Sequence, residues 1–553
     1  MKRTLAGSSV AAVALSSLAL GATTAPAQAH GGVVPQTLST FADMFTGDIS
    51  ATTAAYTVFY VDDGVHGFEP WVTNGTQAGT RMLADVRPGA AGSNPGRFTA
   101  VGSKVYFAAT SPSHGEELWV TDGTPAGTHE VADISPNAVG SHPSALTAVG
   151  DWLYFSADDG THGAELWRTR GTGPTTSLVA NVAPGDQSSG PQGMVALDAD
   201  TVLFRAYTVA EGTELWRTDG TPATTSLVED VNPDGGYADP TALTRVRDGL
   251  VVLRLDDGVH GDELWRTDGT AAGTSLVKDV NPGPPDMGTF RTVLLGKRVL
   301  FEATTAAHGK ELWRTDGTPA GTALVRDISP GAPSGDPDYF RVVGNRLFFA
   351  AQDSRGREPW VSDGTTAGTR IVKDLRPGAD GSSISFILPY AGRAVFAAND
   401  GVTGDQPWTT DGTAAGTLRS THGAAFQTFD LRVHGVHGRR LVLLGHTPQG
   451  YAALGLDLVR ALTIHSAKPR LKVKGGGKAK VGRKLTVKPG AWEKGTKLRF
   501  QWFRAGKKIK GADNRTRKIV RKDRGKKLKV KVTGTLAGHT TVVRWTVPKR
   551  VGR

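Results

Sequence analysis

The sequence contains no cysteine, which excludes disulfide bonds, cysteine metal sites and thiol nucleophiles. After the first thirty residues no apolar run approaches the length of about 18 residues that a membrane-spanning helix needs. The 3.6-residue hydrophobic pattern of a helical solenoid is also missing. Neither a G-x-S-x-G elbow nor an H-E-x-x-H motif is present, so no linear catalytic motif identifies an enzyme. What the chain has in quantity is glycine, 71 of 553 residues, which favours short strands joined by many turns.

The N-terminus has the pattern of a secretory signal. Lys2 and Arg3 are followed by an apolar, small-residue stretch at 10–21, and Ala27 and Ala29 fit an A-x-A cleavage site. We therefore expect a signal peptide at 1–29 and an exported, soluble mature protein. The predicted location is extracellular, or noncovalently associated with the cell wall, because no L-P-x-T-G sorting sequence follows.

One twelve-residue motif recurs through most of the chain. Residues 263–274 read ELWRTDGTAAGT, and related copies start at 69, 117, 165, 214, 311, 358 and 406. The marker tryptophans lie 47–49 residues apart and are Trp71, Trp119, Trp167, Trp216, Trp265, Trp313, Trp360 and Trp408. So constant a period indicates one supersecondary unit repeated many times.

Each period contains four short strand signals. In the third copy these are residues 145–149, 152–157, 165–169 and 177–182, separated by glycine-containing turns. Four antiparallel strands in about 48 residues predict an all-β fold, a β-propeller of eight four-stranded blades. A ninth copy without tryptophan supplies three strands after residue 430. Its fourth strand could come from residues 37–43, so a ninth blade is left open.

The repeat motif resembles the ELWxxDGT repeat of secreted and surface proteins of bacteria, over residues 56–420. The resemblance implies a propeller fold and an exported protein, and it implies little about activity. We assign residues 30–465 to the propeller.

The composition changes near residue 466. Residues 468–553 contain 30 Lys and Arg against three acids, Glu493, Asp513 and Asp523, whereas 32 basic and 49 acidic residues lie between this segment and the signal. Alternating strand patterns at 485–487, 498–503, 528–532 and 541–547 predict a folded domain at 466–553. Its segments 489–495, 501–506, 509–512, 523–528 and 532–534 resemble a small immunoglobulin-like module of actinobacterial secreted proteins. That resemblance implies a β-sandwich in which Trp492, Trp502 and Trp545 belong to the core.

The repeated polar residues of the propeller favour structural roles. The Asp-Gly-Thr aspartates, such as Asp268, fit hairpin turns. Aspartates before the proline-containing loops, such as Asp279, could hold Ca²⁺, but no copy has the D-x-D-x-D spacing of a calcium loop. Loop histidines such as His260 are replaced in other copies. We therefore predict no catalytic, cofactor or metal residues, with Ca²⁺ as a minor alternative.

The basic C-terminal segment is the strongest functional signal, since a field of this sign attracts polyanions. The predicted polyanion-binding residues are Lys507, Lys508, Lys510, Arg515, Arg517, Lys518, Arg521, Lys522, Lys526, Lys527 and Lys529. Anionic cell-envelope polymers or acidic polysaccharide are the expected partners, with a protein ligand on the propeller face and extracellular DNA as further candidates. The overall prediction is an exported, non-enzymatic surface or matrix binding protein. Its propeller would be a ligand-binding platform, and its basic domain an electrostatic anchor to anionic envelope polymers. The alternative is a secreted propeller enzyme acting on polysaccharide, targeted by the basic domain.

Overall fold

The computed structural model describes residues 36–42, 50–136, 138–233, 236–283, 286–288, 290–390, 392–402, 404–419, 432–437, 440–447, 450–456, 466, 468–492, 495–535 and 542–552. The predicted signal peptide lies outside these residues. No helix in the described ranges is long and apolar enough to cross a membrane.

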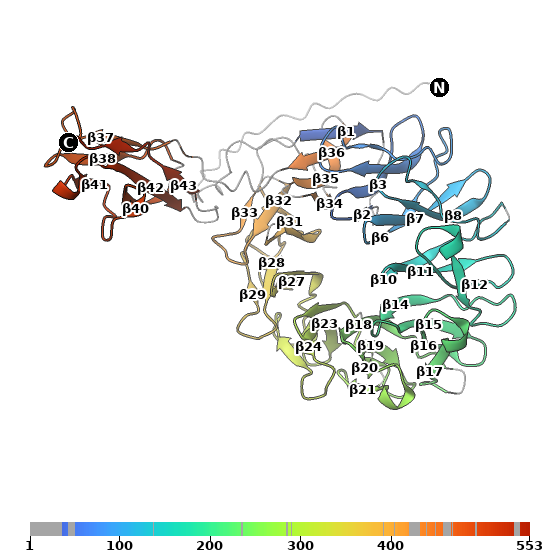
Figure 1. Ribbon diagram of the computed structural model, residues 1–553. Coiled ribbons are helices and arrows are strands. Elements are labelled where there is room, and N and C mark those ends of the chain that lie inside the picture. Colours follow the sequence, from blue (N-terminus) through green and yellow to red (C-terminus); the bar gives the residue numbers. More distant parts are fainter. Residues whose placement is uncertain are drawn as a thin grey trace, which may run out of the picture.

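The described residues before 457 form nine four-stranded antiparallel sheets arranged around a common centre (Figure 1). The prediction of an all-β propeller is confirmed. Blades 1 to 4 are made of β2 (Ser50–Thr52), β3 (Thr57–Asp62), β4 (Phe68–Thr73), β5 (Arg81–Met82); β6 (Gly96–Val101), β7 (Lys104–Ser111), β8 (Gly115–Thr121), β9 (His129–Glu130); β10 (Ser144–Val149), β11 (Trp152–Asp158), β12 (Ala164–Thr169), β13 (Ser177–Ala180); and β14 (Gln192–Ala196), β15 (Val202–Thr208), β16 (Gly212–Thr218), β17 (Ser226–Glu229).

Blades 5 to 8 continue the same order. They are made of β18 (Thr241–Arg247), β19 (Leu250–Asp256), β20 (Asp262–Thr267), β21 (Ser275–Lys278); β22 (Thr292–Leu295), β23 (Arg298–Thr305), β24 (Gly309–Thr315), β25 (Ala323–Arg326); β26 (Asp338–Val343), β27 (Arg346–Asp353), β28 (Gly356–Ser362), β29 (Arg370–Ile371); and β30 (Ile387–Tyr390), β31 (Arg393–Asn399), β32 (Asp405–Thr410), β33 (Leu418–Arg419). Single 3₁₀ turns follow the third strand in three blades, at η1 (Gly173–Thr175), η2 (Pro222–Thr224) and η3 (Ala271–Gly273).

The ninth blade joins the two ends of the propeller. Its strands β34 (Arg432–His437), β35 (Arg440–Thr447) and β36 (Gly450–Leu456) are completed by β1 (Gln36–Phe41), which pairs antiparallel with β36. Leu38 and Phe41 of β1 are buried against Phe59 and Val61 of blade 1. The predicted contribution of the N-terminal segment to the ninth blade is therefore confirmed.

In blades 1 to 8 the second strand is buried on both faces because neighbouring blades cover both. In β23, Val299 and Phe301 pack with Val252 of blade 5, whereas Leu300 packs with Phe349 of blade 7. Successive side chains of a strand point to opposite faces, so a continuous apolar run serves two interfaces. This explains why these strands contain a run of consecutive apolar residues, such as Val299-Leu300-Phe301, instead of alternating apolar and polar ones.

The Asp-Gly-Thr segment is the turn after the third strand. Asp268 Oδ1 accepts hydrogen bonds from the Thr270 backbone N–H at 3.0 Å and the Thr270 hydroxyl at 2.6 Å. Gly269 has φ +83°, a conformation that other residues adopt at a cost. The Gly269 carbonyl also accepts from Arg217 of the preceding blade at 3.0 Å. The turn therefore connects neighbouring blades, and its aspartate is engaged within the turn.

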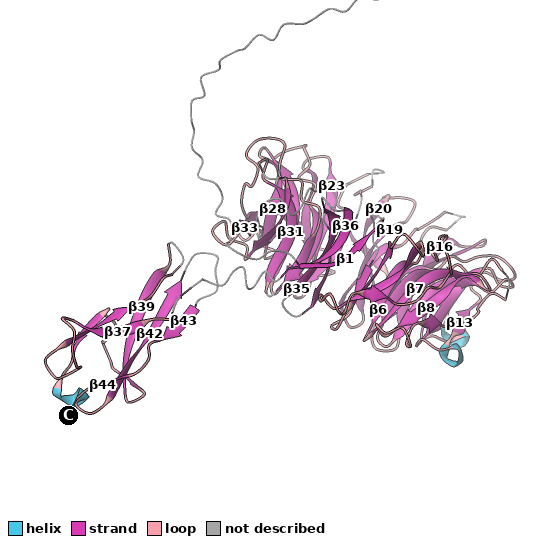
Figure 2. Ribbon diagram, turned by 90° about the horizontal axis from the view of Figure 1, so that it is seen from above, coloured by secondary structure: helices cyan, strands magenta, loops and turns pink. Residues whose placement is uncertain are grey.

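The C-terminal residues form two further antiparallel sheets (Figure 2). The smaller sheet has the order β37 (Arg470–Val473), β38 (Lys484–Lys488), β41 (Thr516–Lys518). The larger has the order β40 (Lys507–Lys508), β39 (Lys497–Arg504), β42 (Lys527–Thr535), β43 (Val542–Trp545), with β44 (Lys549–Arg550) also paired to β42, and η4 (Arg521–Asp523) precedes β42. Residues of both sheets share one apolar core that includes Leu485, Val487, Trp502, Leu528, Val530 and Val532. The basic segment is therefore a folded domain with a buried core.

Candidate functional site

The glutamate that opens the repeat motif is buried and structural. Glu263 is 0% exposed, and its carboxylate accepts from the backbone N–H of Val280 at 2.6 Å and of Asn281 at 3.1 Å. In the other blades whose motif opens with glutamate, the carboxylate accepts equivalent hydrogen bonds from residues 17 or 18 and 24 positions further along the chain. Glu117, for example, accepts from Ser135 and Ser141. Each carboxylate thus holds the loop that leads to the next blade. Sequence reasoning concentrated on the aspartates and missed this residue, although seven of the eight motif copies carry it.

Burial raises the pKa of these carboxyl groups. In Glu214, Glu263, Glu311 and Glu358 desolvation exceeds the opposing effect of the backbone hydrogen bonds and raises the pKa to about 7. The pKa is also raised by burial in Glu69, Glu117 and Glu165. Perturbed carboxyl groups often mark functional sites. Here their repetition in consecutive blades and their bonds to loop backbone assign them to the scaffold.

The marker tryptophans lie between neighbouring blades. The ring of Trp313 is 5.8 Å from Lys278 Nζ of the preceding blade, and the ring of Trp408 is 5.4 Å from Lys373 Nζ. Trp360 and Trp408 are both 2% exposed. These rings contribute to the packing of blade on blade.

The repeated aspartates and histidines do not gather into a site. His260 Nδ1 lies 2.7 Å from Asp257 of its own loop, and His308 Nδ1 lies 3.0 Å from Asp327. Within the described ranges no three His, Asp or Glu side chains are grouped so that they could hold a metal ion. The alternative that the repeated aspartates bind Ca²⁺ stays a prediction.

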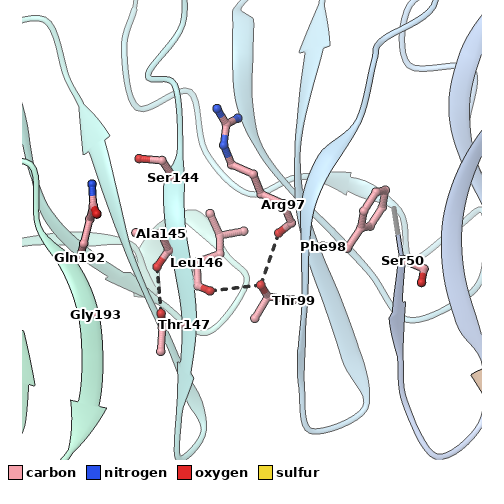
Figure 3. Close-up of a pocket in the computed structure, with 10 residues that line it drawn as sticks. All are labelled: Ser50, Arg97, Phe98, Thr99, Ser144, Ala145, Leu146, Thr147, Gln192 and Gly193. Atoms are coloured by element: carbon pink, nitrogen blue, oxygen red, sulfur yellow. Dashed lines mark hydrogen bonds between the residues drawn. The ribbon is translucent and has the colours of Figure 1, made fainter. Parts of the chain in front are cut away.

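One cavity of about 650 Å³ lies along the first strands of four consecutive blades (Figure 3). It is lined by residues of β2, β6, β10 and β14, including Ser50, Arg97, Thr99, Thr147 and Gln192. Thr99 donates to the Leu146 carbonyl at 3.2 Å, which ties β6 to β10. The described residues that line the cavity include serine and threonine hydroxyl groups, Arg97 and Gln192. Arg97 pairs with Glu116 at 2.7 Å.

A second cavity of about 350 Å³ lies between blades 6 and 7, and its lining departs from the repeat. Its wall holds an ion network in which Asp338 pairs with Arg291 and lies 3.5 Å from Arg357, while Lys310 lies 3.7 Å from Asp336. Burial lowers the pKa of Arg357. The position of Glu302, also in this wall, is alanine, serine or arginine in most other blades. Because each of these cations has a carboxylate partner, the network is accounted for as an inter-blade ion cluster.

Some cations of the C-terminal domain lie on the outward faces of its two sheets. On the smaller sheet the outward residues are all cations or threonine, and they are Arg470, Lys472, Lys484, Thr486, Lys488, Thr516 and Lys518. We name this surface the cationic face. Four of its five cations were missed by the sequence prediction. The alternation in R-L-K-V and K-L-T-V-K could have placed them on one face of a sheet.

The predicted polyanion-binding residues divide between several surfaces. The exposed ones are Lys507, Lys508, Lys510, Arg515, Lys518, Arg521, Lys522, Lys526 and Lys527. Arg517 instead turns inward, with its Nη1 2.8 Å from the fully buried Asp523. Lys529 is half-buried beside Trp545. Among the described residues of this domain, Asp513 is the one exposed carboxylate, so little negative charge offsets the field.

Comparison with known proteins bears on the propeller. No family model matches the chain, and no curated protein is significantly similar to it in sequence. Among solved structures, a puromycin hydrolase is 13% identical with a TM-score of 0.35, over 64% of this chain and 58% of that one. A prolyl endopeptidase is 11% identical with a TM-score of 0.39, over 64% and 55%. The β-propeller domain of the Trilobed protease from Pyrococcus furiosus is 12% identical with a TM-score of 0.31, over 60% and 98%.

These similarities correct one prediction. A non-enzymatic binding protein was expected, but the similar solved structures are peptidases and a protease domain, and that prediction is contradicted. The chain spans little more than half the length of the two whole peptidases. At these identities the likeness concerns the propeller architecture, and no reaction or substrate is transferred from it.

Proposed function

We propose that this protein binds anionic polymers through its C-terminal domain, and that the cationic face is the principal contact. The observation that carries the proposal is the register of β37, β38 and β41, which places five cations on one outward surface. Like charges placed side by side on a sheet are unfavourable for folding. A bound polyanion removes that repulsion and releases its own counterions, which makes binding favourable and sensitive to salt.

We further propose that the chain is an exported member of the ELWxxDGT-repeat proteins, that residues 466–553 are an immunoglobulin-like domain, and that the partner is an anionic polymer outside the cell. The signal pattern at 1–29, the repeat motif and the two-sheet core support these proposals. In this arrangement the basic domain delivers the propeller to the polymer.

The test compares two double variants of the full chain on immobilised polyphosphate. Lys484→Gln with Lys518→Gln removes two charges that face each other on the cationic face. Lys507→Gln with Lys510→Gln removes two exposed charges, one in β40 and one just after it, as the matched control. The first pair is expected to weaken binding more than the control. Equal losses would show that net charge, and not this face, governs the affinity.

A further inference from the structure

The outward face of the larger C-terminal sheet differs from the cationic face because it carries aromatic and apolar side chains. Of the twelve tryptophans of the chain, all within the described residues, Trp545 is the most exposed, at 39%. Val543 and Val547, at alternate positions on the same segment, are 37% and 62% exposed. The prediction that Trp545 belongs to the core is therefore wrong, whereas Trp502 is fully buried and Trp492 packs against the core.

Basic side chains surround this tryptophan. Lys529 Nζ lies 4.3 Å from the centre of the Trp545 ring, and Phe503 meets the same ring edge-on at a centroid distance of 5.0 Å. Lys531 is the direct cross-strand partner of Trp545, and Lys508 is that of Phe503. An exposed ring with ammonium groups beside it presents an apolar surface and positive charge to the same ligand.

We infer that this face, made of Phe503, Lys529, Lys531 and Trp545, is a binding site for an acidic polysaccharide; the inference rests on the proposed function. A sugar ring has an apolar C–H face that packs on an indole, and a carboxylate or sulfate on that ring would reach the neighbouring ammonium groups. Polymers without rings can use the charges but not the indole.

Single-stranded nucleic acid fits the face less well. Successive bases stack on successive aromatic platforms, but the Phe503 and Trp545 rings are inclined by 61° and do not form two parallel platforms. Recognition of base edges also needs free polar groups. The Gln501 amide, on the same face by register, already donates to the Ile509 carbonyl at 2.9 Å and the Ala512 carbonyl at 3.2 Å.

The experiment measures the binding of the full chain to three probes: polygalacturonate, polyphosphate and an oligo-dT strand. Trp545→Ala is compared with Val543→Ala as a control on the same strand, and Trp545→Phe retains a ring. Trp545→Ala is expected to lower affinity for polygalacturonate about fivefold or more, the lower end of what removal of a stacking aromatic costs in single-stranded nucleic-acid sites. Affinity for polyphosphate should stay nearly unchanged, because polyphosphate has no ring to pack on the indole. The affinity of Trp545→Phe for polygalacturonate should lie between those of the wild-type chain and Trp545→Ala.

The other outcomes have separate meanings. If the wild-type chain binds none of the probes, the proposed function itself fails. If it binds polyphosphate but Trp545→Ala leaves polygalacturonate binding unchanged, or lowers both equally, the saccharide site is refuted. A larger loss for oligo-dT than for polygalacturonate would make the face a nucleic-acid surface instead. Near-ultraviolet circular dichroism of each variant separates these results from misfolding.

Discussion

Lys484 and Lys518 are direct partners across the antiparallel pair β38–β41, so two ammonium groups share one exposed sheet face. Directly opposed like charges destabilise a sheet by a few tenths to about 1 kcal/mol. Under the proposed function, the domain carries a local cost to stability at a position where its positive charge would attract a polyanion.

This relationship predicts that a substitution that removes the repulsion stabilises the domain and weakens polyanion binding. Lys518→Glu creates an opposite-charge pair with Lys484 and should stabilise the C-terminal domain by roughly 0.2–1 kcal/mol at low salt, while it weakens binding to polyphosphate. Thermal unfolding and binding measured on the same preparation test this. Lys510→Glu, at an exposed turn position, is the control. A variant that loses both stability and binding would contradict the assignment.

The buried Asp523 predicts a second effect in the same domain. Burial would raise its pKa, but hydrogen bonds from Arg517, the Val520 N–H and Arg504 bring the pKa below its usual value. The carboxylate therefore contributes stability above its unfolded pKa and loses it as the pH falls through the folded pKa. Asp523→Asn should destabilise the domain by about 3–5 kcal/mol, because two arginines lose their charged partner. Asp513→Asn, at an exposed site, should leave unfolding by urea nearly unchanged.

The motif glutamates predict that the propeller becomes less stable between pH 5 and pH 8. A carboxyl group whose folded pKa is raised, here to about 7 in four blades, binds more protons in the folded state. Stability is then fully present below the unfolded pKa and falls as the pH rises through the folded value. The raised pKa of His66, His114 and His260 acts in the same direction. Urea unfolding followed by tryptophan fluorescence should show this decline, and a midpoint that rises with pH would contradict it.

The ninth blade predicts a dependence of the whole propeller on its N-terminal strand. Phe41 is 6% exposed, and its ring centre lies 5.2 Å from that of Trp71. Phe41→Ala should cost about 3–5 kcal/mol and lower the melting temperature of the propeller. The exposed Thr40 provides the control Thr40→Ala. Equal melting temperatures for both variants would show that β1 is dispensable.

Much of the fold could be read from the sequence because each element carries a local signal. Strand patterns, Asp-Gly turns and the constant tryptophan spacing determined the propeller, and the likeness of residues 37–43 to a fourth strand located its completion. The structural role of Glu263 was not read, because its partners, Val280 and Asn281, are backbone N–H groups that no side-chain pattern reveals.

The candidate binding surfaces were only partly predictable, since they depend on register. Arg517 lies in a basic run but faces inward to Asp523, whereas Lys472, Lys484 and Lys518 are far apart in sequence and become neighbours only across β37, β38 and β41. Trp545 was assigned to the core by resemblance, but alternation along β43 buries Val542 and turns the indole outward.

The most direct test of polyanion binding is the affinity of the full chain for polyphosphate across a sodium chloride series. Each cation that contacts a single-stranded polyanion contributes a slope of roughly −0.7 to the plot of log affinity against log salt. The five cations of the cationic face therefore predict a slope of roughly −3 or steeper. A slope near zero, or no binding at the lowest salt concentration, would contradict the proposed function.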